Sequence, residues 1–495
     1  MILSSERRPA RRLGVLLSAV LAVVLGAVAA GAQTPAAEQV GAQAPRTYAT
    51  NSYAAVVSRA APAVVTVRSQ RRVTASEQRI PFLDDPTLRE FFGDRLPQGR
   101  QVPRPERQRG LGSGVIVSPD GYILTNHHVV EGAEQITIEL TDRRTLSAKL
   151  VGSDPPSDLA VLKVDVAGLP SLPLGDSDRV QVGDVVLAIG NPLGIGQTVT
   201  SGIISAKGRQ TGLGDGSFED FLQTDAAINR GNSGGALISA DGELIGINSQ
   251  ILSPSGGSIG IGFAIPSNMA RDVMSQLVKS GRVRRGMVGV TIQPVTADIA
   301  ASLDIGQPRG ALVSSVMPGG PAERAGLRRG DIIVAVNNAP VADSNTFRNT
   351  VARMQPGTPA SVTVLRDGRE QQFRLTLGEL PAETSRGGRE GEGDDPGEAE
   401  GGRLGVTVEP LTPEAAARLE LPRDTRGLAI TGVNSDGPAA EAGLRRGDVI
   451  QEVNRQPVRT AEELRAALDR AGTRPALLLV TNERGTGYVT VRPRR

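Results

Sequence analysis

Two adjacent histidines, His127 and His128 in the stretch LTNHHVVEG, are the only histidines of this 495-residue chain. A serine surrounded by glycines, Ser233 in RGNSGGAL, follows them later in the sequence. An imidazole that accepts the proton of a serine hydroxyl creates a nucleophile for acyl transfer. Glycines beside the serine permit a tight turn whose backbone N–H groups can stabilise the resulting oxyanion. These residue types therefore indicate serine hydrolase chemistry.

The order of these residues along the chain separates the hydrolase folds that use such a serine. The segment around Ser233 also matches G-x-S-x-G, the nucleophile elbow of α/β-hydrolases, which place their histidine after the serine. No histidine follows Ser233, so this fold is excluded. A subtilisin-like site requires an α/β scaffold, whereas GALISADGELIGINSQIL after Ser233 is typical of a β-hairpin. The remaining order is histidine, aspartate, serine on β-barrels.

An aspartate between His128 and Ser233 must complete such a site. Asp158 is favoured because it opens SDLAVLKV, where an apolar strand can partly bury it against an imidazole. Asp154 and Asp165 are interpreted as turn or solvent residues. The candidates between the two positions are Asp142, Asp154, Asp158, Asp165, Asp176, Asp178, Asp184, Asp215, Asp220 and Asp225.

Short strands and turns dominate the part of the chain that must position these residues. SGVIVSPDGYILTNHHVV contains two apolar runs around Pro-Asp-Gly and predicts a hairpin. Many short strands with few helical periods predict an all-β barrel or sandwich. The segment SNMARDVMSQLVKSG predicts a closing helix with Ser267 as its N-cap and a glycine at its end.

The N-terminal residues resemble an export signal. Four arginines precede an apolar run that ends in Ala-Gly-Ala, which predicts a signal peptide over residues 1–32, with an uncleaved membrane anchor as the alternative. Without this segment the net charge of +2 becomes about −1, which gives no indication of nucleic-acid binding. Residues 33–47 predict a flexible tether, and residues 70–109 a long mobile loop with an aromatic island at Phe82, Phe91 and Phe92.

The C-terminal half contains an internal repeat. GALVSSVMPGGPAERAGLRRGDIIVAVN begins at Gly310, and GLAITGVNSDGPAAEAGLRRGDVIQEVN begins at Gly427; both contain AGLRRGD. Between the repeats, residues 381–402 are rich in glycine and acidic residues and predict a solvated linker.

The motifs TNHHVV, SDLAVLKV, IGNPLG and GNSGGAL, followed by the two repeats, resemble the HtrA/DegP (Do-like) serine proteases. The resemblance covers nearly all of the chain beyond the signal. It implies a mostly β fold, with a trypsin-like double β-barrel protease domain over residues 48–281 and PDZ domains over 283–380 and 403–495. It assigns the catalytic roles to His128, Asp158 and Ser233 and the oxyanion hole to backbone N–H groups of Gly231 and Ser233. On an extended segment neighbouring side chains face opposite sides, so His127 is interpreted as a bystander.

The same resemblance implies the residues that contact substrate. Ile251, in GINSQIL, matches a position that narrows the specificity pocket, and cleavage after small aliphatic residues such as Val or Ala is expected. Asn232 is grouped with the substrate-binding residues, although it lies between the oxyanion donors and its side chain need not act. The PDZ peptide-binding loops match residues 285–290 and 403–406, and the second loop lacks the glycine after its arginine. The peptide-binding residues of the first loop are Arg285, Met287, Val288, Gly289 and Val290.

The resemblance implies ATP-independent endoproteolysis of unfolded or misfolded envelope proteins in the periplasm, and the presence of His128, Asp158 and Ser233 favours this function. The expected partners are unfolded polypeptides and free C-terminal peptides, and the resemblance implies trimers or multiples of trimers. Neither cofactor nor metal is expected, because the chain lacks cysteine and neighbouring histidines on a strand do not converge on one ion. The alternative is a holdase or PDZ scaffold with a latent protease site.

Overall fold

The computed structural model describes residues 52–72, 107–191, 196–211, 218–253, 257–381, 403–472, 474–483 and 485–493. The predicted signal peptide, tether and aromatic island, and all but the first residue of the predicted linker, lie outside these ranges. The predicted loop over residues 70–109 is too long at both ends. Residues 70–72 continue strand β1 and residues 107–109 begin β2, because the two strands pair from Val64–Val115 as far as Arg72–Arg107.

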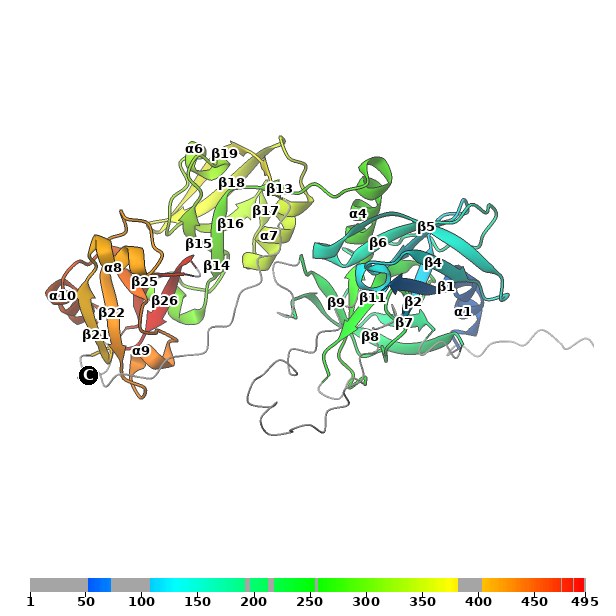
Figure 1. The fold of residues 1–495 in the computed structure, drawn as a ribbon, viewed down its shortest axis with the longest axis horizontal. Helices are drawn as coiled ribbons and strands as arrows, with labels where there is room; N and C mark the ends of the chain where they lie inside the picture. Colours follow the sequence, from blue (N-terminus) through cyan, green and yellow to red (C-terminus); the bar gives the residue numbers. More distant parts are fainter. Residues whose placement is uncertain are drawn as a thin grey trace, which may run out of the picture. The chain divides into compact units, whose positions relative to one another are not determined.

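A closed six-stranded barrel forms the first half of the N-terminal domain, with the strand order β1-β2-β3-β6-β5-β4 (Figure 1). Every neighbouring pair is antiparallel. The elements are α1 (Ala54–Ala60), η1 (Ala61–Ala63), β1 (Val64–Arg72), β2 (Arg107–Ile116), β3 (Tyr122–Thr125), α3 (His127–Val130), β4 (Gln135–Glu139), β5 (Thr145–Asp154), η4 (Pro155–Ser157) and β6 (Leu159–Lys163).

A second closed barrel, with the order β10-β11-β12-β9-β8-β7, is followed by the helix α4. Gly281 ends α4 in the left-handed conformation, as predicted, whereas Ser267 is not the N-cap: it lies in the first turn and its hydroxyl donates to the Gly175 carbonyl. The elements are β7 (Val185–Gly190), β8 (Thr198–Arg209), β9 (Phe221–Thr224), β10 (Ala236–Ser239), β11 (Leu244–Ile251), β12 (Gly262–Pro266) and α4 (Ser267–Ser280).

Both predicted hairpins are present and bring the site residues to the barrels. The β2–β3 hairpin pairs Val115 with Leu124, and Gly121 turns it with a positive φ of 100°. The β10–β11 hairpin turns at Gly242, where φ is 91°. Alternating side chains enter a shared aliphatic core, in which Ile116, Leu124 and Leu162 are fully buried. Apolar burial of this kind dominates the folding free energy, so the barrels form a rigid frame for the loops between them.

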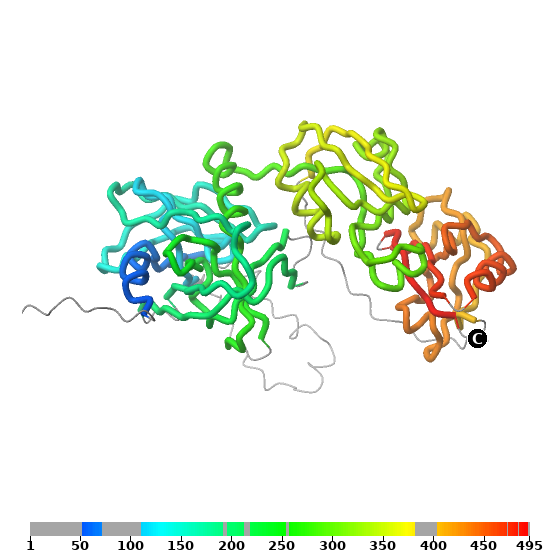
Figure 2. The backbone as a smooth tube through the Cα atoms, turned by 180° about the vertical axis from the view of Figure 1, so that it is seen from behind, coloured from blue at the N-terminus to red at the C-terminus, as the bar shows by residue number. Residues whose placement is uncertain are grey.

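The two repeats fold into domains with the same strand order. Figure 2 traces their backbones, green to yellow in the first copy and orange to red in the second. The main sheets have the strand orders β14-β15-β16-β18-β19 and β21-β22-β23-β25-β26. The short strand β17 pairs with β16, and the equivalent β24 pairs with β23. The first copy contains β13 (Gly286–Met287), β14 (Val290–Pro294), α5 (Ala297–Ser302), β15 (Ala311–Val316), α6 (Pro321–Ala325), β16 (Ile332–Val336), β17 (Ala339–Pro340), α7 (Ser344–Arg353), β18 (Pro359–Arg366), β19 (Arg369–Thr376) and β20 (Gly378–Glu379). The second contains β21 (Val406–Pro410), α8 (Pro413–Arg418), β22 (Leu428–Val433), α9 (Pro438–Glu441), β23 (Val449–Val453), β24 (Gln456–Pro457), α10 (Ala461–Ala471), β25 (Ala476–Asn482) and β26 (Gly485–Val491).

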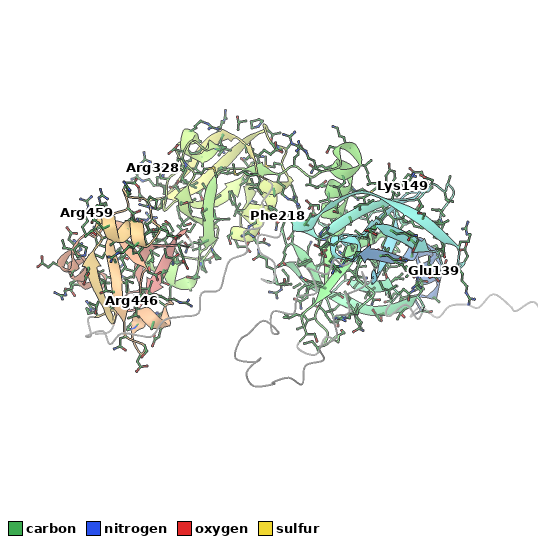
Figure 3. The ribbon with its side chains drawn as sticks, viewed as in Figure 1. Glu139, Lys149, Phe218, Arg328, Arg446 and Arg459 are labelled. Atoms are coloured by element: carbon green, nitrogen blue, oxygen red, sulfur yellow. The ribbon has the colours of Figure 1, made fainter. Side chains whose placement is uncertain are left out.

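The identical AGLRRGD segments have a structural role. In the first copy Asp331 is buried and accepts from the backbone N–H of Arg328, and in the second Asp448 does the same for Arg445. The arginines of the motif are exposed, and Figure 3 shows Arg328 and Arg446 extending from the surface. A buried carboxylate needs such hydrogen bonds to offset its lost hydration, which explains why the aspartate recurs in both copies.

The two repeat domains share an apolar cluster. Leu477, Leu479 and Tyr488 of the second copy pack with Leu312 and Ile332 of the first. Strand β25 is therefore buried on both faces, since its alternate residues enter the core of the second copy. Burial, together with the nearby Glu452 carboxylate, raises the pKa of the Tyr488 phenol to about 12.

We expect this phenol to make stability fall in alkaline solution. A phenol whose folded-state pKa lies above its unfolded value of about 10 contributes stability that is complete below pH 10 and is lost as the pH rises toward 12. In an NMR titration of ¹³Cζ-tyrosine-labelled protein, one phenol should stay protonated at about pH 11. That signal should be missing from Tyr488→Phe, and its persistence there would assign it to another tyrosine.

No helix in the described ranges is both long enough and apolar enough to cross a membrane.

Candidate active site

His128 and Asp158 are in direct contact. The Nδ1 atom of His128 lies 2.9 Å from both carboxylate oxygens of Asp158, and the backbone N–H of His128 donates to Oδ1 at 3.1 Å. A carboxylate in this position keeps the Nδ1–H tautomer, which leaves Nε2 as the ring nitrogen that can accept a proton. Among the candidate aspartates, Asp158 is therefore the one whose carboxylate binds the His128 ring.

The two histidines lie on a helical turn and not on an extended segment as predicted. His127 and His128 begin α3, with the backbone N–H of His127 donating to the Asp158 carbonyl at 3.1 Å. The His127 ring is mostly buried, and its Nε2 lies 3.9 Å from the Glu131 carboxylate. Consecutive side chains on a helix also point in different directions, about 100° apart. Of the two rings, that of His128 contacts the Asp158 carboxylate.

A strained turn presents Asp158. The residue has a left-handed φ of 53°, which is uncommon outside glycine, and it follows the turn η4 formed by Pro155–Ser157. Its carbonyl oxygen accepts from the Asn126 side chain at 2.9 Å as well as from His127. The Thr125 hydroxyl donates to the Ser113 carbonyl. These bonds hold the turn against the end of β3.

Ser233 lies in a tight glycine-rich turn before β10. Its carbonyl accepts from the N–H of Ser113, while the N–H of Gly234 donates to Asn248 on β11. Gly234 has a φ of 83°, and a Cβ there would overlap the Ser113 carbonyl oxygen. The glycine is therefore required both by the conformation and by the close approach of β2.

Ser249 connects two residues of the site and was not predicted from the sequence. Its hydroxyl donates to Oδ2 of Asp158 at 2.9 Å, and its carbonyl accepts from the Ser233 hydroxyl at 2.8 Å. It belongs to β11, in the GINSQIL segment, but no local pattern distinguishes it from other strand serines.

A cleft of about 600 Å³ contains His128, Asp158 and Ser233 together. Its apolar lining includes Ile228 and Ile251, so the predicted pocket residue Ile251 borders the same cavity. The other lining residues relevant here are Phe218, Glu219, Phe221, Ser249 and Gln250.

Asn232, which the sequence groups with the substrate-binding residues, is buried, with 2% of its surface exposed. Its side-chain nitrogen lies 3.5 Å from the Ala227 carbonyl. The Asn232 side chain lies close to Gly190, and Asn232 is not among the residues that line this cleft.

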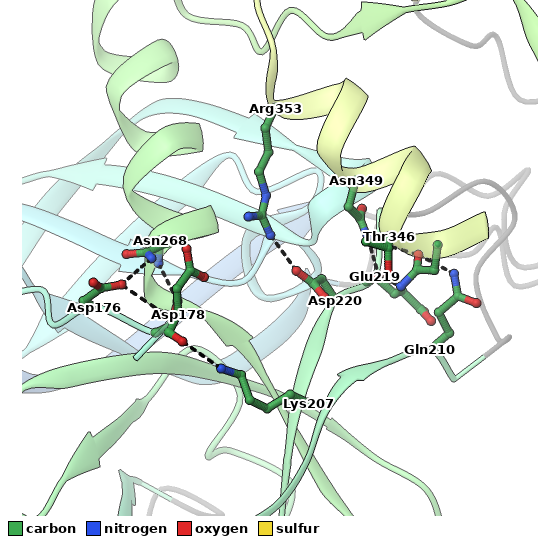
Figure 4. A network of polar contacts seen from close by, with 12 residues as sticks. Asp176, Asp178, Lys207, Gln210, Glu219, Asp220, Asn268, Thr346, Asn349 and Arg353 are labelled. Carbon is green, nitrogen blue, oxygen red and sulfur yellow. Dashed lines mark hydrogen bonds and ion pairs between the residues drawn. The ribbon is translucent and has the colours of Figure 1, made fainter. Parts of the chain in front are cut away.

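The loop that includes Phe218, Glu219 and Asp220 also contacts helix α7 of the first repeat domain (Figure 4). Asn349 and Asn345 both donate to the Glu219 carbonyl, and Arg353 pairs with Asp220 at 2.5 Å. Burial raises the pKa of the Asp220 carboxyl despite this arginine. The Glu219 carboxylate accepts from Thr211, so it faces its own loop.

Asp154 is buried and ion-paired, contrary to its interpretation as a turn or solvent residue. Both of its carboxylate oxygens are bound by the guanidinium of Arg285, at 2.8 and 2.5 Å. The guanidinium also stacks on the ring of Phe218, 4.4 Å from its centroid. The guanidinium of Arg285, which the family resemblance places in the first peptide-binding loop, is therefore engaged with Asp154 and Phe218.

Replacing Arg285 with methionine should destabilise the protease domain strongly. The side chains of Arg285 and Asp154 are 11% and 6% exposed, so the substitution leaves a buried carboxylate without its cation. We expect a loss of about 3–5 kcal/mol, measured as a lower melting temperature in calorimetry. Lys149→Met is the control: it breaks the exposed Lys149–Asp165 pair and should cost less than about 1 kcal/mol. Equal effects of the two substitutions would contradict the assignment.

The candidate peptide-binding loops have the same backbone arrangement in both copies. The carbonyls of Val288 and Gly289 accept from Ala322 and Met317, and those of Leu404 and Gly405 accept from Ala439 and Asn434. The second loop reaches this conformation without a glycine after Arg403. The Arg403 guanidinium binds Asp469 and the Gly472 carbonyl at the end of α10.

Comparison with known families identifies the domains. Residues 112–247 match the trypsin-like peptidase domain, and residues 273–377 and 429–482 each match a PDZ domain. The first match contains His128, Asp158 and Ser233. The predicted fold class, a mostly β chain with a double-barrel protease domain and two PDZ domains, is confirmed.

Related proteins extend over most of the chain. A probable periplasmic serine endoprotease, DegP-like, from Chlamydia muridarum is 44% identical over 84% of this chain and 81% of its own length. One from Pseudomonas putida is 42% identical over 88% of this chain and 92% of its own length. Among solved structures, the HtrA-type protease AlgW with decapeptide is 49% identical, with a TM-score of 0.53, over 67% of this chain and all of that one. The chain is therefore a serine endopeptidase and belongs to the HtrA-type, DegP-like family of proteases with PDZ domains.

Proposed function

We propose that the chain is an ATP-independent periplasmic endopeptidase that degrades unfolded or misfolded envelope proteins. The contact between His128 and both oxygens of Asp158, in the same cleft as Ser233, carries this proposal. An open cleft with apolar walls suits an extended polypeptide segment that exposes aliphatic side chains. The periplasmic location is supported by the names of the relatives and by the export-like N-terminal sequence.

In the proposed reaction Ser233 Oγ attacks the scissile carbonyl while His128 Nε2 accepts its proton. Asp158 holds the imidazole and stabilises the imidazolium, which then protonates the leaving amine. The backbone N–H groups of Gly231 and Ser233 bind the oxyanion. Ile251 and Ile228 restrict the side chain before the cleaved bond, which favours small aliphatic residues.

The PDZ domains act in capture of substrate or C-terminal peptides. The exposed edge of β14 in the first copy is suited to adding an extended peptide, and Met287, Val288, Gly289 and Val290 lie at its start. The equivalent edge strand of the second copy is β21. Trimers, or multiples of trimers, are the assembly that the family resemblance implies.

The proposal is tested by digesting reduced casein with the mature chain. Apyrase first removes residual ATP, so that any cleavage occurs without nucleotide. We expect fragments whose cut sites follow mainly Val or Ala, with no effect of added ATP. Cut sites that follow mainly basic or aromatic residues would overturn the substrate preference. Suppression of casein aggregation without any cleavage would instead support the holdase alternative, and light scattering with multi-angle detection would test the trimer.

A further inference from the structure

Ser113, a fully buried residue of β2, holds the turn that carries Ser233 at two points. Its backbone N–H donates to the Ser233 carbonyl at 2.8 Å. Its hydroxyl donates to the Gly231 carbonyl at 2.6 Å. One residue of the first barrel therefore binds the peptide groups on both sides of the one that carries the Ser233 N–H.

A third partner fixes the direction of the Ser113 hydroxyl. The backbone N–H of Asn191, which directly follows β7, donates to the Ser113 Oγ at 2.9 Å. An N–H group can only donate, so Oγ accepts there and its single hydrogen is directed to the Gly231 carbonyl. Because both Ser113 and Gly231 are buried, loss of the hydroxyl would leave this carbonyl without its hydrogen bond and without hydration in exchange.

The Gly231–Asn232 peptide group lies between the two proposed oxyanion donors, the N–H groups of Gly231 and Ser233. Its N–H donates to the Asn229 carbonyl at 2.9 Å, and its carbonyl accepts from Ser113. Gly231 has a φ of 98°, as the third residue of a type II turn requires. Each donor belongs to a neighbouring peptide group, so the orientation of this one sets the direction of both. Stabilisation of an oxyanion depends on donors that are fixed before the reaction.

We propose that Ser113 is a positioning residue for the oxyanion hole. Its hydroxyl holds the Gly231–Asn232 peptide group, so that the two donors converge on the oxygen of the tetrahedral intermediate. Ser113 is not among the residues that line the cleft, so it acts through the turn and not on the substrate. Its loss should therefore weaken binding of an oxyanion and leave binding of an uncharged ligand nearly unchanged. This inference rests on the proposed roles of Gly231 and Ser233.

A peptidyl trifluoromethyl ketone and the alcohol made by reducing its carbonyl test this role. Ser233 Oγ adds to the ketone carbon, the hydroxyl proton passes to His128 Nε2, and the ketone oxygen becomes an oxyanion. The alcohol has the same side chains but forms no oxyanion. Titration calorimetry of the full chain measures both Kd values without any turnover. Ser113→Ala should weaken binding of the ketone at least about tenfold and that of the alcohol less than about threefold.

Ser267→Ala is the matched control. Ser267 is also fully buried, and its hydroxyl donates to a backbone carbonyl, that of Gly175, at 2.9 Å. Both substitutions should lower the melting temperature, since each removes a buried hydrogen bond. Only Ser113→Ala should lose the preference for the ketone over the alcohol. An unchanged preference in Ser113→Ala, or an equal loss in both variants, would overturn the proposal.

Ser113→Cys is a milder substitution, because a thiol is a weaker donor than a hydroxyl. Its preference for the ketone should lie between those of Ser113→Ala and the wild type, and a preference equal to that of the wild type would contradict the role of the hydrogen bond. The wild-type chain reports on the proposed nucleophile separately. If it binds the ketone no more tightly than the alcohol, Ser233 does not add to the carbonyl, and the positioning role falls with the proposed reaction.

Discussion

Ser233→Ala should abolish casein digestion, lowering kcat/KM by at least about 10⁴-fold, since the nucleophile of a serine hydrolase has no substitute in the site. The substitution removes only the Oγ atom and its bond to Ser249. The turn should persist because its backbone bonds, from Ser113 to Ser233 and from Gly234 to Asn248, are unchanged. The measurement is the rate of fragment release, together with a circular dichroism spectrum that matches the wild type.

A matched control is Ser275→Ala on the exposed side of α4, where the hydroxyl donates to the Asp272 carbonyl. This variant should digest casein at the wild-type rate. Undiminished proteolysis by Ser233→Ala would show that another residue attacks the substrate and would overturn the proposed triad.

Asp158→Asn should lower kcat by about 10⁴-fold with a much smaller change in KM. The carboxylate accepts from His128 Nδ1, the His128 backbone and the Ser249 hydroxyl. An amide NH₂ facing Nδ1 would donate where the carboxylate accepts, which favours the tautomer with hydrogen on Nε2. That nitrogen could then no longer take the proton of Ser233. Steady-state kinetics on a peptide substrate measures the effect.

Asp165→Asn provides the comparison for this charge change. Asp165 is 71% exposed and pairs with Lys149, whose proximity lowers the pKa of the carboxyl at the surface. Its loss should leave kcat within about twofold, because an exposed ion pair contributes little to stability. A similar kcat for Asp158→Asn and Asp165→Asn would show that Asp158 does not orient His128 or stabilise its imidazolium during the reaction.

The chemistry of this protein was predictable from the sequence where it depends on residue type and order. The position of both histidines before Ser233 excluded the order of an α/β-hydrolase. The apolar strand that begins after Asp158 distinguished this residue from the other candidate aspartates. Pro-Asp-Gly and Ala-Asp-Gly predicted the hairpins that present the site, because glycine permits the positive φ that these turns use. The recurrence of AGLRRGD predicted two equal domains.

Other features depended on contacts between distant segments, which periodicity and turn residues do not encode. The sequence suggested that Asp154 is a turn residue, but Arg285 from the first PDZ domain forms an ion pair with it. This ion pair offsets the hydration that the Asp154 carboxylate loses on burial. Asn232 looked available to substrate, yet close packing against Gly190 buries it. The histidine pair looked extended, whereas a helical turn is held by the Asp158 carbonyl.

Ser249 illustrates the distinction most directly. The sequence determined that Ser233, a histidine and an aspartate occur in the order of a trypsin-like protease. Only closure of the second barrel, with its bulge in β11, brings the Ser249 hydroxyl to Asp158 and its carbonyl to Ser233. The register of antiparallel strands sets which backbone groups meet, and a single extra residue changes their direction. Residue types thus established the reaction, while strand register decided how its nucleophile is held.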